Sequence, residues 1–176
     1  MTFNFNIEAQ TSSSAGTKKI LVAYFSHSGN TKAVAEQICK ATGGDIFRIE
    51  PVTAYPEEYN KLVDQAKKEV ESSYKPAIKG KAPNIGTYDI IFVGSPSWWS
   101  TIAPPVATFL SGSNLTGKTI IPFITHEGSR MGRSAADIKK LCPGSTVLEG
   151  LPIRGSHATD SQNEIKQWLQ SIKIIK

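Results

Sequence analysis

The chain has 176 residues, of which 39% are hydrophobic and 20% charged, as is usual for one globular domain with its own core. No apolar run approaches the roughly 18 residues of a membrane span. Two distant cysteines, Cys39 and Cys142, argue against a disulfide framework. The net charge of +5 comes from scattered lysines, which argues against nucleic-acid binding.

Residues 1–18 are polar and rich in small side chains. We expect a flexible N-terminal arm here, ahead of a single domain at 19–176. The arm lacks the basic and apolar regions of a secretory signal, which predicts a cytoplasmic protein. A leader removed before residue 1 would be compatible with an exported form.

The domain opens with a strand that runs into a polar turn. The apolar run Ile20–Phe25 is typical of a strand buried on both faces, and a helical pattern begins at Thr31. The turn between them consists of Ser26, His27, Ser28, Gly29 and Asn30. Such small donors before a helix bind anions, and phosphate is the expected occupant. The alternative is an ordinary turn with a capping side chain.

The later elements alternate between helices and strands. Gly43 and Gly44 end the first helix. A strand at 46–49, a helix starting at Pro56, a strand at 89–94 and a helix starting at Pro104 follow. Next come a strand at 119–124, a helix with a capping box Ser134-x-x-Asp137, a strand at 147–153 and a last helix with a capping box Ser161-x-x-Glu164.

Five apolar strands alternating with five helices predict an α/β fold. We expect a five-stranded, parallel, doubly wound sheet with helices on both faces. Such sheets bind ligands at the carboxyl ends of their strands. The polar segments that follow the first, third and fourth strands should therefore lie along one edge and form one site.

One motif falls outside this edge. Residues 112–119 match the nucleotide-binding pattern G-x-x-x-x-G-K-[ST]. A working loop of that kind follows a strand and opens a helix, whereas this one follows a helix and opens a strand. We therefore interpret it as an ordinary turn at the opposite edge.

The segment after the third strand carries two adjacent tryptophans, Trp98 and Trp99. Both cannot face the same side of a strand, so one should face a cavity or solvent. An aromatic side chain at a ligand-binding edge can stack on a flat ring system. The alternative is an exposed structural pair.

The segment after the fourth strand, 125–133, contains two glycines and several donors. Gly128 and Gly132 allow a close approach of the backbone to a ligand. The three histidines, His27, His126 and His157, have no metal-ligand spacing, so we predict no metal site. For His27 we favour an exposed loop position over a catalytic role.

Taken together, the three segments resemble the flavodoxin family. The pattern Ser26-x-Ser28-Gly29-Asn30-Thr31 is similar to its phosphate loop, and Trp98-Trp99 and Leu141-Cys142-Pro143-Gly144 resemble a short-chain bacterial group. The resemblance implies strand order 2-1-3-4-5 and bound FMN, which itself carries the chemistry. The contacts it implies are Ser26, His27, Ser28, Gly29, Asn30, Thr31, Ser95, Pro96, Ser97, Trp98, Trp99, Ser100, Thr101, Thr125, His126, Glu127, Gly128 and Gly132.

Two departures from the family bear on function. The third segment carries Arg130 and Arg133 where flavodoxins are acidic, and the second has no glycine from Ser95 to Thr101. The resemblance implies electron transfer through FMN to a redox partner protein. An NAD(P)H-dependent quinone, azo or FMN reductase is the alternative, and a flavin-free interaction module the third possibility. We expect a monomer or homodimer.

Overall fold

The computed structural model describes residues 17–176, so nearly all of the predicted N-terminal arm lies outside the described residues. A sheet with strand order β2-β1-β3-β5-β6 forms the centre. Short β4 pairs antiparallel with β3, and β7 pairs parallel with β5. The strands are β1 (Ile20–Tyr24), β2 (Asp45–Arg48), β3 (Ile90–Trp98), β4 (Thr101–Ile102), β5 (Thr119–His126), β6 (Thr146–Val147) and β7 (Leu151–Arg154).

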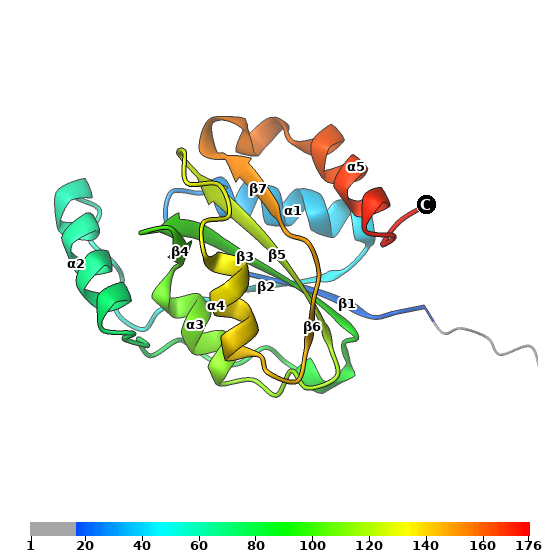
Figure 1. Ribbon diagram of the computed structural model, residues 1–176, viewed down its shortest axis with the longest axis horizontal. Helices are drawn as coiled ribbons and strands as arrows, with labels where there is room; N and C mark the ends of the chain where they lie inside the picture. Colours follow the sequence, from blue (N-terminus) through cyan, green and yellow to red (C-terminus); the bar gives the residue numbers. More distant parts are fainter. Residues whose placement is uncertain (1–16) are drawn as a thin grey trace, which may run out of the picture.

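Helices cover both faces of the sheet (Figure 1). Helices α1 (Asn30–Thr42) and α5 (Gln162–Ser171) pack on one face, and α3 (Pro104–Ser111) and α4 (Ser134–Leu141) on the other. Helix α2 (Tyr59–Glu71) lies at the side, beyond β4 (Figure 1). Two 3-10 helices, η1 (Ile85–Thr87) and η2 (Gly155–Asp160), complete the described elements.

The continuous apolar strands form two core layers because successive side chains point to opposite faces. Val22, Phe92 and Ile121 lie side by side beneath α1 and α5, and Leu21, Ile91 and Ile120 lie in register beneath α3 and α4. All six are almost fully buried. Each such side chain contributes about 1.5–3 kcal/mol through burial.

The predicted doubly wound fold and its strand order are confirmed, with β5 as the fourth strand and β6 and β7 as two pieces of the fifth. The single strand predicted at 147–153 is thus interrupted. The interruption lies opposite Ile121 and Pro122, since Ile120 pairs with Val147 and Phe123 with Leu151. Pro122 has no N–H to give to an adjacent strand, which accounts for the gap.

Helix α2 differs from its prediction. It begins at Tyr59 rather than at Pro56, because Glu58 is still extended, with φ −67° and ψ 122°. Tyr59 is 74% exposed. Ala66 is the one buried residue of α2. The apolar side of α2 therefore adds little to the core and instead lines the cleft described below.

Neither predicted capping box forms. Ser134 is already helical, its Oγ is buried without a partner among residues 17–176, and Asp137 accepts a hydrogen bond from Thr101 instead. Ser161 does precede α5, but its Oγ donates to the carbonyl of His157 at 2.6 Å. Contacts with other segments have replaced both local caps.

The segment 112–119 is a helix-to-strand turn, as predicted from its context. It joins α3 to β5, at the opposite end of the sheet from the carboxyl ends of the strands. The ammonium group of Lys118 donates to the carbonyls of Tyr88 and Gly86 at 2.6 and 2.9 Å. Lys118 thus ties the turn to η1 and to the residue after it, just ahead of β3. Within residues 17–176, no helix has both the length and the apolar character needed to cross a membrane.

Candidate cofactor-binding site

A cleft of about 920 Å³ opens at the carboxyl ends of β1, β3 and β5. The segment after β1, the turn between β3 and β4, and the segment after β5 form three of its sides, and α2 forms the fourth. This edge is where parallel sheets bind ligands. The volume lies in the range of roughly 300–1,000 Å³ that is usual for small-molecule sites.

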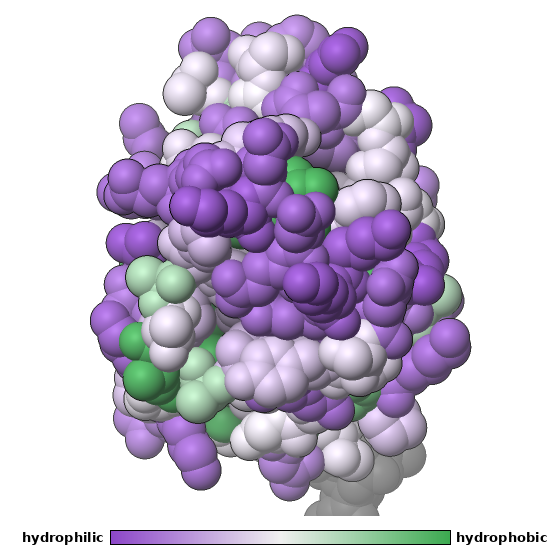
Figure 2. All heavy atoms as spheres, turned by 90° about the vertical axis from the view of Figure 1, so that its left-hand side faces the viewer, coloured by the Kyte–Doolittle hydropathy of each residue, from purple (hydrophilic) through white to green (hydrophobic). Residues whose placement is uncertain are grey.

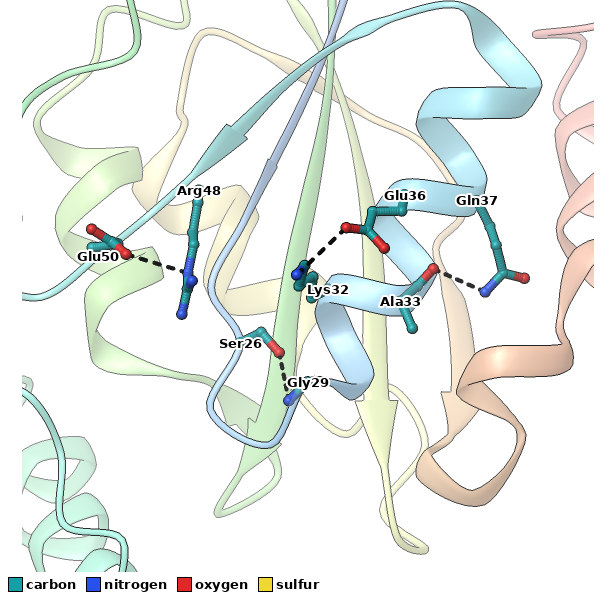
Figure 3. A network of polar contacts seen from close by, with 8 residues as sticks. All are labelled: Ser26, Gly29, Lys32, Ala33, Glu36, Gln37, Arg48 and Glu50. Atoms are coloured by element: carbon teal, nitrogen blue, oxygen red, sulfur yellow. Dashed lines mark hydrogen bonds and ion pairs between the residues drawn. The ribbon is translucent and has the colours of Figure 1, made fainter.

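The segment between β1 and α1 is a tight turn closed by its own side chain. Gly29 has φ 97°, in the left-handed region that glycine adopts without strain. Its N–H donates to Ser26 Oγ at 3.1 Å (Figure 3). Helix α1 starts at the next residue, so its unpaired N–H groups and positive dipole end face this turn.

Two pairs of charged side chains lie close to this turn (Figure 3). Lys32 Nζ lies 3.7 Å from Glu36, and Arg48 Nε lies 3.5 Å from Glu50. The turn itself contains no lysine or arginine. Its donors for an anion are therefore backbone N–H groups, hydroxyls and the Asn30 amide.

Two contacts connect this turn with later parts of the chain. The hydroxyls of Thr31 and Thr125 lie 2.8 Å apart, and both residues are buried. Asn30 and Glu127 meet above Gly155, the first residue of η2. A Cβ at Gly155 would collide with Glu127 Oε1 and lie 2.6 Å from Asn30 Nδ2. The missing side chain at 155 thus leaves room for Asn30 beside the turn.

The segment expected to be a loop, 95–101, is mostly strand. β3 continues to Trp98 and pairs with β4 through a two-residue turn, Trp99-Ser100. Both turn residues have positive φ, 51° and 63°, as in a type I′ turn. That conformation suits Asn and Gly, so this hairpin carries backbone strain.

The β3–β4 hairpin packs against the segment that follows β5. A Cβ on Gly132, which has φ 47°, would collide with the Ser100 carbonyl. The same carbonyl accepts the Arg133 N–H at 2.8 Å. Ser95 Oγ accepts the N–H of Ala103 at 2.8 Å. Glycine at 132 therefore lets the segment after β5 pack directly against the turn.

The two tryptophans have different surroundings. The ring of Trp98 packs edge-on against Tyr55 and Phe25, with centroids 4.8 and 5.4 Å apart. Trp99 is 48% exposed and reaches α2, where its Nε1–H donates to the Val63 carbonyl at 3.2 Å. Both rings line the cleft. One is held by an aromatic cluster, and the other stands between the hairpin and α2.

His126 ends β5 at the floor of the cleft. It is buried, and its Nδ1 has no hydrogen-bond partner within residues 17–176. Burial, and then the positive charge of Arg130, lower the pKa of the imidazole below its usual value. The surroundings of His126 therefore favour the neutral imidazole.

The face that carries α2 is mostly hydrophilic (Figure 2). Apolar side chains appear on it only as small, separate areas. A polar rim around an aromatic wall suits a ligand with a flat ring and charged groups.

The sequence model of the flavodoxin family, described as "Flavodoxin", matches residues 19–172. The chain belongs to the flavodoxin family. A search of curated proteins gives no significant match. The cleft lies at the switch point of the sheet, where the strand order reverses beside β1.

Solved structures of similar proteins agree with the family. A candidate flavoprotein from Bacteroides eggerthii is 38% identical, with a TM-score of 0.79 over 90% of this chain and 99% of its own. A Lactobacillus acidophilus flavoprotein in complex with FMN is 24% identical, with a TM-score of 0.70 over 86% and 98%. Oxidised Flavodoxin 1 from Bacillus cereus is 20% identical, with a TM-score of 0.54 over 89% and 96%. The latter two support the fold alone.

Most of the predicted site residues line the cleft. They are His27, Ser28, Asn30, Pro96, Ser97, Trp98, Trp99, Ser100, Thr125, His126, Glu127 and Gly128. The others lie behind this lining and support it. Ser26 and Gly29 shape the first turn, Thr31 bonds to Thr125, and Ser95, Thr101 and Gly132 hold the hairpin.

The α2 side of the cleft was not predicted from the sequence. Glu57, Tyr59, Leu62, Val63, Ala66 and also Ser129 line it. Gly155, which makes room for Asn30, was not predicted either. The apolar stripe of α2 was visible in the sequence, but periodicity does not distinguish a stripe that faces a core from one that faces a cleft.

Proposed function

We propose that this flavodoxin-family chain binds FMN in the cleft and transfers electrons through it. The observation that carries the proposal is the meeting of an anion-accepting turn and two tryptophans in one cleft of suitable volume. Membership of the flavodoxin family supports the same ligand, and the L. acidophilus flavoprotein, which shares the fold, is solved in complex with FMN. The flavin supplies the redox chemistry, and the protein supplies binding, orientation and electrostatics.

The residues of the first turn fit a phosphate group. Nothing lies within 4 Å of a Cβ position on Gly29, so the turn has open space in front of it. Ser28, Gly29, Asn30 and the start of α1 would hold the phosphate through N–H and O–H donors. Ser26 and Thr31 keep the turn in shape through their own hydrogen bonds.

The aromatic wall fits the flat ring of the flavin. We assign ring stacking to Trp99, whose ring is half exposed in the cleft, and assign Trp98 to the wall behind it. The segment 125–128 would contact the polar edge of the ring. Pro96 and the strained Trp99-Ser100 turn make this side of the cleft rigid.

The proposed role is that of an electron carrier for a redox partner protein. An NAD(P)H-dependent reductase is the second candidate, and the arginines favour it. Arg130 and Arg154 both act on His126 and have no ion-pair partner in the described part of the chain. Cationic groups beside a flavin favour its anionic reduced form and an anionic electron donor.

Two experiments test these proposals. FMN and riboflavin, which lacks the phosphate, are titrated into the purified chain and into Asn30→Ala. FMN should bind much more tightly than riboflavin, and Asn30→Ala should reduce this preference by about 1.5–3 kcal/mol, the value of one charge-assisted hydrogen bond. Equal affinity for both ligands would contradict the phosphate assignment.

The electron-transfer role is then tested under anaerobic conditions with FMN-loaded protein. A carrier should accept electrons one at a time from a chemical reductant and react slowly with NADH and NADPH. Rapid two-electron reduction by either nucleotide, with turnover of a quinone or azo compound, would establish the reductase instead. A folded chain that binds no flavin would favour the third possibility, a flavin-free interaction module.

A further inference from the structure

His126 differs from the other two histidines of the chain. His27 also lines the cleft, but its Nε2 lies 3.0 Å from the Pro56 carbonyl. His157 is exposed on η2. His126 is 9% exposed, lines the cleft, and keeps a buried Nδ1 without a partner among residues 17–176.

Four charged groups act on this imidazole from three elements. Arg130 and Glu127 belong to the segment after β5, Arg154 ends β7 opposite His126, and Glu164 lies on α5. The arginines oppose a positive charge on the ring, and the carboxylates favour it. The facing residues of the β3–β4 hairpin, 96–102, carry no charge. Burial and Arg130 have the largest effects, so the pKa of the imidazole is lowered.

We propose that His126 takes up a proton from solvent when an anionic ligand fills the cleft, so that capture of FMN is linked to pH. This inference rests on the proposed function, because FMN is the anion. One proton moves from solvent to the imidazole, and no electron is transferred. His126 is then a binding residue that is charged only in the occupied site.

The physical reason is the change of charge in a partly buried space. The phosphate dianion is assigned to the first turn, which the hydrogen bond between Thr31 and Thr125 holds beside the segment that carries His126. Its negative charge attracts a proton to the ring and offsets the effect of Arg130 and Arg154. A protonated imidazole carries a full positive charge and therefore binds an anion more strongly than the neutral ring does. Neutral Ser28 and Asn30 cannot respond to the ligand in this way.

Linkage sets the direction of the effect. A group that gains a proton on binding makes binding tighter as the pH falls through its pKa in the complex. The affinity rises by at most about tenfold for each pH unit of decrease. It stops rising once the pH is below the pKa of His126 in the free protein. Gln at position 126 keeps a polar group but takes up no proton, so its complex should lack this dependence.

The test is calorimetric titration of the full chain with FMN near pH 7, in two buffers with different ionisation enthalpies. The difference between buffers gives the number of protons taken up. The wild type and the exposed-site control His157→Gln should take up a measurable fraction of one proton more than His126→Gln. Comparing variants cancels proton exchange by the FMN phosphate itself.

NMR titration of the His126 ring in the wild type gives a second measure that needs no variant. Its pKa should rise when FMN binds. FMN binding with equal proton uptake in wild type and His126→Gln, or an unchanged ring pKa, would overturn the inference alone. No heat of FMN binding by folded wild type would contradict the proposed function, and this inference with it.

Discussion

The hydroxyl groups of Thr31 and Thr125 lie 2.8 Å apart although the residues are separated by 94 positions in the chain. Thr31 lies in the first turn of α1, and Thr125 lies near the end of β5. Because both are buried, this contact fixes the distance between the first turn of the cleft and the segment that carries His126. The two sides of the site are thus coupled by one hydrogen bond.

Replacing either threonine should destabilise the fold. Thr31→Val leaves the Thr125 hydroxyl buried and unpaired, which costs about 1–3 kcal/mol in the free energy of unfolding. The double variant Thr31→Val, Thr125→Val should cost less than the sum of the two single variants, by about 0.5–3 kcal/mol. Urea unfolding of the four proteins measures this coupling. Additive losses would show that the contact is absent in solution.

Gly132 and Gly128 provide a matched pair for the hairpin. Gly132→Ala forces a Cβ into the Ser100 carbonyl at a positive φ, and should lower the free energy of unfolding by about 2 kcal/mol or more. Gly128→Ala enters open space and should change it by less than about 0.5 kcal/mol. Thermal and urea unfolding check both values. Equal effects would refute the close packing at 132.

Gly155→Ala should weaken FMN binding more than it weakens the fold. The added methyl group meets the flexible ends of Asn30 and Glu127, which can move at small cost. Loss of the Asn30 contact with phosphate should reduce FMN affinity by about tenfold or more. The control is Ser156→Ala, at the adjacent exposed position. An unchanged FMN affinity in Gly155→Ala would show that Asn30 does not contact the phosphate.

The two tryptophans should respond differently to substitution. Trp99→Asn places a residue that tolerates the left-handed conformation in the turn, so the free energy of unfolding should change by less than about 1 kcal/mol. The affinity for FMN and the quenching of flavin fluorescence should both fall. Trp98→Ala removes a ring packed on Tyr55 and Phe25 and should cost about 3 kcal/mol of stability. The reverse pattern would assign the stacking to Trp98.

The free energy of unfolding should fall at high pH, because Tyr88 loses its phenolic proton there. Its hydroxyl donates to Asp45 at 2.7 Å, and this bond, followed by burial, raises the pKa of Tyr88 to about 12. The ordinary value is about 10, so the stabilisation is complete below that pH and is lost as the pH rises through about 12. The stability difference between wild type and Tyr88→Phe should shrink over this range. A constant difference would contradict the assignment.

The fold was predictable because its strands are continuous apolar runs, such as those around Val22, Phe92 and Ile121, which suit only a sheet covered on both faces. The position of the cleft followed, since polar segments come directly after β1 and β5. Gly29 was also predictable, because a tight turn into a helix requires its φ.

Other features depended on tertiary contacts that leave no local pattern. Ser134 and Ser161 have the spacing of capping boxes, yet Thr101 and His157 take the bonds that the caps would have made. The strand character of 95–98 depends on pairing with β4. Tyr59, Leu62 and Ala66 share one face of α2 by their spacing, and all three line the cleft, because α2 stands away from the sheet.

The most direct test of the account is titration of the purified chain with FMN while flavin fluorescence is followed. The account predicts saturable quenching at about one FMN per chain, because the cleft binds the phosphate in its first turn and places an indole against the ring. A folded chain that leaves FMN fluorescence unchanged, and that does not retain FMN on dialysis, would contradict it.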